Sequence, residues 1–146
     1  MPGAEPQRLR SWNTAAVRPA EQFSYYREAI CQAFMNLTPE QPATPGFLAR
    51  VETVGLGNGA INRVSFPEHV VRRSAADIAA SSRRCYYLNL KLAGRCRIQQ
   101  AGREISLSPG RLPLMVGVWT TWPALRIVAA TGSNSAPVCQ APWTRT

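Results

Sequence analysis

Histidine and lysine are almost absent from this chain, which has one of each, His69 and Lys91, among 146 residues. Metal-dependent enzymes of small β folds hold their ion with several histidines and a carboxylate, so a lone histidine argues against a metal centre. His69 is also the only candidate base for a nucleophilic serine or cysteine. It stands beside Pro67 and Glu68, and we expect it at the surface or at a strand edge. The sequence therefore predicts neither an enzyme nor a bound cofactor.

Long hydrophobic runs are also missing. The longest spans residues 112–125, contains Pro113 and Pro123, and falls short of the roughly 20 apolar residues that a membrane-spanning helix needs. Residues 1–10 are polar and lack the apolar stretch of a signal peptide. We therefore expect a cytoplasmic protein with no membrane association. The cysteines form no CxxC pair and are expected to be reduced, small apolar residues: Cys31, Cys85, Cys96 and Cys139.

Basic residues outnumber acidic ones by 17 to 8, giving a net charge of +9. Such a balance can indicate a polyanionic partner. The basic residues are scattered, however, with only Arg72–Arg73 and Arg83–Arg84 adjacent, and no helix carries a basic stripe beside stacking aromatics. A solvated surface is the expected role of these charges, and we expect no direct binding to DNA.

An amino-terminal helix is predicted over residues 20–34. Pro19 suits the first turn of a helix, and apolar residues follow at three- and four-residue spacing. They are Phe23, Tyr26, Ile30 and Phe34. This stripe should pack on a sheet of the same chain, with pairing to a second subunit as the alternative.

Short strands separated by turn residues are predicted from residue 47 onward. Residues 49–53 and 61–66 should flank a hairpin at 55–59, and residues 69–73, 96–98 and 105–107 should add further strands. The clearest strand spans 86–92, where Tyr86, Leu88, Leu90 and Leu92 are expected on a buried face and Tyr87, Asn89 and Lys91 on a wet one. The fold class is mainly β with an amino-terminal helix, arranged as an antiparallel β-barrel of the jelly-roll type.

Several segments resemble the amino-terminal ligand-binding domain of AraC-type transcription regulators. They are Trp12 with Thr14, PAEQFSYYREAIC from Pro19, Arg72–Arg73 before Asp77 and Ile78, and YYLNLKLAGRCRIQQAGREISLSPG from Tyr86. The resemblance covers about residues 10–110. It implies a cupin-like barrel that binds a small-molecule effector, such as an aromatic or carboxylated metabolite or a sugar, and that supports a homodimer.

The chain departs from this family pattern at Arg111. No acidic residue follows Glu104, and three of the four tryptophans fall in the final segment. We divide the chain into an arm (1–18), a ligand-binding and dimerisation domain (19–110) and an atypical tail (111–146), for which we expect a frameshift or rearrangement as the origin. The barrel is expected to be incomplete at this end, and the helix-turn-helix domain of the family is expected to be lacking. The alternatives are a non-functional fragment of a disrupted gene or a stand-alone cupin enzyme.

The resemblance directs the search for a binding site to the mouth of the barrel. A ligand pocket needs apolar walls and a few orienting polar groups. The candidate walls are Tyr86, Leu88, Leu90 and Ile98, and one of Arg63, Arg72 and Arg73 is a candidate partner for a carboxylate. The alternative is that the four apolar residues are ordinary core and the arginines are solvated.

Overall fold

The computed structural model describes residues 8–34, 36–56, 59–80, 85–100, 102–110, 114–117, 125–130 and 135–142. Within these ranges, the side chains of residues 56, 85–89, 100, 114–117, 125–130 and 135–142 are not described.

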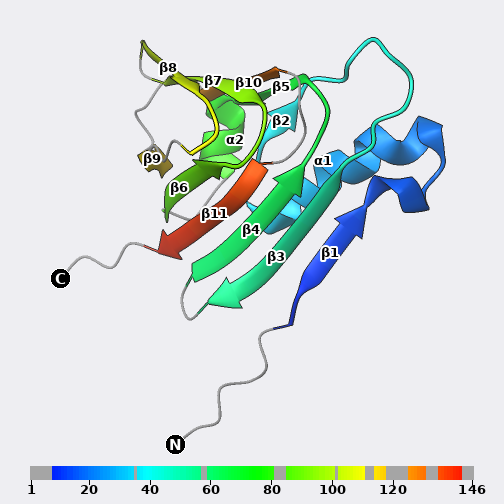
Figure 1. Ribbon diagram of the computed structural model, residues 1–146, viewed down its shortest axis with the longest axis horizontal. Coiled ribbons are helices and arrows are strands. Elements are labelled where there is room, and N and C mark those ends of the chain that lie inside the picture. Colours follow the sequence, from blue (N-terminus) through cyan, green and yellow to red (C-terminus); the bar gives the residue numbers. More distant parts are fainter. Residues whose placement is uncertain are drawn as a thin grey trace, which may run out of the picture.

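The described strands form two antiparallel sheets that lie in two layers (Figure 1). The first sheet has the order β1 (Arg10–Asn13), β3 (Arg50–Leu56), β4 (Gly59–Ser65), β11 (Ser135–Pro142), β6 (Cys85–Lys91) and β9 (Leu114–Gly117). The second has the order β2 (Thr38–Pro39), β5 (His69–Arg73), β10 (Leu125–Ala130), β7 (Arg95–Gln100) and β8 (Arg103–Leu107). The predicted mainly β, antiparallel class is confirmed, whereas the described strands give two sheets and no closed barrel.

Helix α1 (Gln22–Ala33) follows a 3-10 turn over Pro19–Glu21, as the position of Pro19 predicts. Its buried side chains include Tyr26 and Ile30, which pack against Val51 and Val64 of the first sheet. The predicted apolar stripe therefore packs on a sheet of its own chain. In Figure 1 the helix lies behind β3, beside the second sheet.

Strand alternation separates an interior face from an outer face in both sheets. On β4, Asn62 and Val64 are buried while Arg63 between them is exposed. The second sheet has the same pattern, with exposed arginines between its buried residues. Those buried residues are His69, Val71 and Arg73 on β5, Cys96 and Ile98 on β7, and Leu107 on β8. We call the space that these two faces enclose the interior.

The predicted orientation of β6 is wrong at its described end. Lys91 is buried, with 7% of its surface exposed, whereas Leu92 is 46% exposed. The register explains this, because Lys91 and the buried Val64 both pair with Ser135 of β11 and so lie on one face. The prediction had chosen the opposite face of β6 as the buried one, because the alternate residues on that face, such as Leu90 and Leu92, are apolar.

The segment after Gly110 supplies three strands, two of them internal. β10 lies between β5 and β7, and β11 lies between β4 and β6. The expected loss of the last strands is therefore not confirmed. Pro137 falls where the register of β11 shifts between Ser135 and Val138, a position where a missing backbone donor is tolerated. The domain boundary after Gly110 and the frameshift remain predictions.

Two short features fix the chain around the interior. The hairpin β3–β4 turns between Leu56 and Gly59, within the predicted segment. Gly94 and Gly102, at the predicted breaks after β6 and β7, have φ angles of 71° and 72°, which glycine adopts without strain. A second helix, α2 (Ala75–Ala80), lies between β5 and β6 and was not predicted.

Candidate functional site

Asn62 is the most unusual polar residue of the interior. It is 0% exposed, and neither its amide nitrogen nor its amide oxygen has a hydrogen-bond partner among the residues that the structure describes. An unpartnered buried polar group costs about 1–3 kcal/mol, and native proteins keep few of them. Asn62 therefore offers a free donor and a free acceptor to a molecule bound between the sheets.

Lys91, the only lysine of the chain, is the second polar residue of the interior. Its ammonium nitrogen lies 5.8 Å from the centroid of the Phe66 ring. Among the described residues, no carboxylate lies within ion-pair distance of it. Burial lowers the pKa of Lys91, and the nearby Cys96 thiol opposes this shift. A buried cation is costly unless an anion or a hydrogen-bond acceptor compensates it.

Arg73, at the end of β5, is the third polar residue of the interior. It is buried, and its Nε has no hydrogen-bond partner in the described part of the chain. Desolvation raises the pKa of the Asp77 carboxyl group, but the hydrogen bonds from Ser74 and Thr38, with a smaller contribution from the charge of Arg73, outweigh it, so the pKa is lowered. No ion pair joins the described side chains of Arg73 and Asp77. Part of the guanidinium is thus available to an acceptor in the interior.

The three polar residues are spread along the interior. Lys91 contacts Phe66, whose ring lies 4.8 Å from that of His69 at the start of β5. Arg73 is four residues further along β5, which corresponds to about 13 Å at roughly 3.3 Å per residue. On β4, Val64 is level with Lys91, because both residues pair with Ser135. Asn62 lies two residues before Val64 on the same strand, which leads into β5. We therefore place Lys91 near one end, Arg73 near the other and Asn62 between them.

His69 belongs to a buried aromatic cluster, so the prediction of a surface or edge position is wrong. The ring stands edge-on to Tyr26, Phe47 and Phe66, with centroid distances of 5.2, 5.1 and 4.8 Å. Its Nδ1 donates to the Pro67 carbonyl at 2.9 Å, so Nε2 accepts from the Tyr26 hydroxyl at 2.9 Å. Burial lowers the pKa of His69 and favours the neutral ring that this pattern requires. The residue is a satisfied core histidine.

The predicted site residues divide into three groups. Arg73 and Ile98 lie on the interior face of the second sheet, whereas Leu90 is half-buried on the face of β6 opposite to Lys91. Arg63 and Arg72 are exposed on outer faces and do not reach the interior. The side chains of Tyr86 and Leu88 lie outside the described residues. The sequence analysis did not predict Asn62 as a site residue, and it predicted Lys91 on the solvent-facing side of β6. That Lys91 is the only lysine of the chain could have marked it as unusual.

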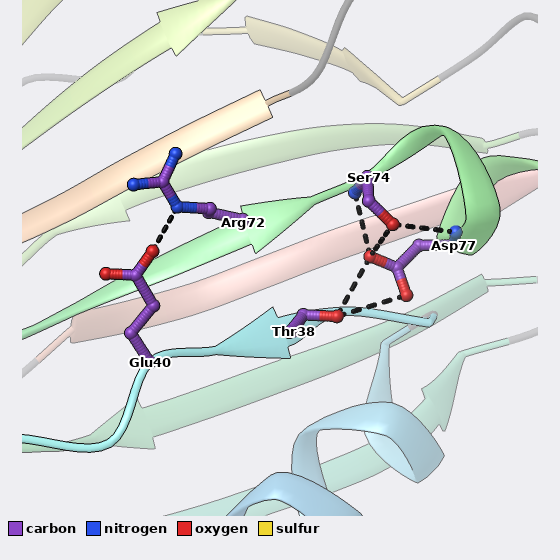
Figure 2. A network of polar contacts seen from close by, with 5 residues as sticks. All are labelled: Thr38, Glu40, Arg72, Ser74 and Asp77. Atoms are coloured by element: carbon purple, nitrogen blue, oxygen red, sulfur yellow. Dashed lines mark hydrogen bonds and ion pairs between the residues drawn. The ribbon is translucent and has the colours of Figure 1, made fainter.

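Figure 2 shows a network of polar contacts close to Arg73 in the sequence, in which Thr38, Glu40, Arg72, Ser74 and Asp77 take part. Arg72 forms an ion pair with Glu40. Asp77 accepts hydrogen bonds from the backbone N–H and the hydroxyl of Ser74, both at 2.8 Å, and from the Thr38 hydroxyl at 3.0 Å. The Asp77 N–H in turn donates to the Ser74 hydroxyl at 3.1 Å, which makes the reciprocal cap of a helix start. This network fastens α2 to β2 and has a structural role.

The described part of the chain contains no group of three or more histidine, cysteine or acidic side chains that could hold a metal ion. None of its helices is long and apolar enough to cross a membrane.

Comparison with known proteins identifies the domain. A family model, that of the AraC-binding-like domain, matches residues 26–116. The chain belongs to this family. A curated relative, an uncharacterised protein encoded in the nit 5′ region of Bacillus sp. strain OxB-1, is 34% identical over 102 residues. The match covers 70% of this chain and 40% of the relative.

The fold matches part of a regulator of known structure. The crystal structure of the AraC-like transcriptional activator CuxR superposes with a TM-score of 0.75 at 19% identity, over 92% of this chain and 47% of that one. This coverage extends the shared fold into the segment after Gly110. The cupin domain of Schizosaccharomyces pombe Cnp3 is less similar, with a TM-score of 0.47 at 8% identity over 73% of this chain and 69% of that one. This AraC-binding-like domain spans less than half the length of the Bacillus relative and of CuxR.

Proposed function

We propose that this AraC-binding-like domain senses a small-molecule effector held in the interior between its two sheets. The observation that carries the proposal is Asn62, which is fully buried while both ends of its amide are unpartnered. A purely structural interior residue would have its hydrogen bonds satisfied or would be apolar. A ligand that accepts from the Asn62 nitrogen and donates to its oxygen removes the cost of burying the amide.

The surroundings of Asn62 suit a binding site. The interior faces add apolar residues such as Val71 and Ile98, and they keep Lys91 and Arg73 out of bulk water. Few polar groups on largely apolar walls are the usual composition of a small-molecule site. We propose a binding function without catalysis.

The remaining parts of the proposal follow the family. We propose that the chain is cytoplasmic, that it forms a homodimer and that it does not itself bind DNA. The apolar stripe of α1 is occupied by the first sheet, so a dimer would form through another surface. Sedimentation velocity at several protein concentrations tests dimerisation, because a dimer gives a concentration-dependent shift to about twice the monomer mass.

Effector binding is tested with the purified chain and a panel of small molecules that includes sugars, aromatic acids and dicarboxylates. A compound that binds raises the midpoint of thermal unfolding, since it stabilises the folded state only. We expect Asn62→Leu to abolish this rise. Arg63→Leu, on the same strand but on the outer face, is the matched control and should keep it. An equal rise in the wild type and in Asn62→Leu would refute binding at the interior amide.

A further inference from the structure

The acidic residues of the chain leave the interior cations without partners. Seven of the eight lie in the described part of the sequence, and the eighth is Glu5. Three of the seven form ion pairs with arginines outside the interior, namely Glu21 with Arg18, Glu40 with Arg72 and Glu52 with Arg50. Asp77 caps α2, and the last three, Glu28, Glu68 and Glu104, are exposed. None lies on the buried interior face.

The sequence after β8 adds no acidic side chain that could pair with the interior cations. No acidic side chain follows Glu104, so the strands β9, β10 and β11 bring none into the interior. Asp77 is near enough to Arg73 for their charges to interact, but none of the seven described acidic side chains forms an ion pair with Lys91 or Arg73. Burying an unpaired charge costs several kcal/mol, so the natural compensation is an anion that arrives with the ligand.

The positions of the two cations define the shape of this ligand. Lys91 lies beside Phe66, near the start of β5, and the backbone of Arg73, at the end of β5, lies about 13 Å from that of His69 at roughly 3.3 Å per residue. A ligand that lies along β5 can meet both cations and pass the level of Asn62. We propose that the effector is an elongated molecule with an anionic group at each end, one bound by Lys91 and the other by Arg73, and with a central polar group that hydrogen-bonds to Asn62. This inference rests on the proposed effector site.

Each residue has a distinct part in this recognition. The planar guanidinium of Arg73 has its Nε free and suits a carboxylate or phosphate through paired N–H donors. The Lys91 ammonium supplies a point charge beside the face of Phe66. Carboxylate and phosphate share this chemistry, so the probes have to distinguish them.

The test is isothermal titration calorimetry of the full chain with four kinds of probe. These are straight-chain dicarboxylates from succinate to sebacate, a sugar bisphosphate, a monocarboxylate matched in length to each dicarboxylate, and a neutral polyol. We expect a dianion of suitable length to bind at least tenfold more tightly than its matched monoanion. Preference for dicarboxylates or for the bisphosphate identifies the anionic group.

Substitutions then assign the two ends. Lys91→Met and Arg73→Met should each weaken dianion binding at least tenfold, to the affinity of the matched monoanion, because each removes one contact. Arg72→Gln, next to Arg73 on the outer face, should change it less than twofold. Lys91→Met should also raise the unfolding midpoint of the free protein, since it removes an unpaired buried charge. If Arg73→Met folds poorly, the dianion affinity and the unfolding midpoint of Lys91→Met still test the proposal.

The outcomes separate this inference from the proposed function. If a neutral polyol or a monoanion binds as tightly as any dianion, and Asn62→Leu abolishes that binding, the interior site stands and the dianionic effector is refuted. Unchanged dianion affinity in Lys91→Met also refutes it. If no probe binds the wild type, the dianionic effector is refuted and the interior site loses its support as well.

Discussion

Replacing Asn62 by leucine is expected to make the free protein more stable. Leucine has the same number of side-chain heavy atoms as asparagine, with the same branching, and carries no polar atoms. The substitution removes two unpartnered amide groups, each of which costs about 1–3 kcal/mol when buried. It also adds a buried apolar side chain, worth about 1.5–3 kcal/mol.

The sum of these terms is an upper bound, because leucine has to fit a space shaped for a planar amide. We expect a gain of about 2 kcal/mol in the free energy of unfolding. For a chain of this size that corresponds to a rise of roughly 4–8 °C in the unfolding midpoint.

Urea unfolding followed by circular dichroism measures this change. The slope with urea should be unchanged and the midpoint should rise, which is the signature of a stability change alone. Arg63→Leu on the outer face is the control and should stay within about 0.5 kcal/mol of the wild type. A loss of more than 1 kcal/mol in Asn62→Leu would mean that the amide is satisfied in the free protein, and the reasoning about the interior would be refuted.

Three further perturbations test the packing that positions the interior. Tyr26→Phe should cost about 1–3 kcal/mol in urea unfolding, because it leaves Nε2 of buried His69 without its donor. Thr14→Val should cost a similar amount, about 1–3 kcal/mol, since the Thr14 hydroxyl donates to the Phe47 carbonyl at 2.6 Å and accepts from the Ala49 N–H at 2.7 Å. The pKa of His69 is lowered in the fold, so the unfolded chain binds the extra proton first, and stability should fall as pH drops below the unfolded pKa of about 6.5. His69→Gln should flatten this part of the profile, and an equal slope in the variant would assign it to other groups.

The sequence predicts local structure well where periodicity and turn chemistry agree. Pro19 and the stripe containing Tyr26 and Ile30 predict α1, and the glycines at 94 and 102 predict the turns on either side of β7. Helix α2 was not predicted, because its six residues are too few to show an apolar periodicity. Its start nevertheless carries a local signal, since Ser74 is followed three residues later by Asp77, which caps the helix.

The interior polar residues could not be predicted in the same way. Strand alternation gives two faces but not which one is buried, and the greater apolarity of Leu90 and Leu92 favoured the wrong face of β6. The pairing of Lys91 and Val64 with β11, a strand far along the chain, decides the orientation. The burial of Asn62 likewise depends on β10 and β11, which come from the last part of the sequence and lie inside the two sheets. No pattern in the sequence around Asn62 predicts this burial.

An effector site between the two sheets is best tested by calorimetric titration of the wild type, Asn62→Leu and Arg63→Leu with a compound that stabilises the wild type. We expect Asn62→Leu to be more stable than the wild type yet to bind the compound at least tenfold more weakly, while Arg63→Leu binds it normally. Equal affinity in Asn62→Leu and the wild type would contradict an effector site between the two sheets.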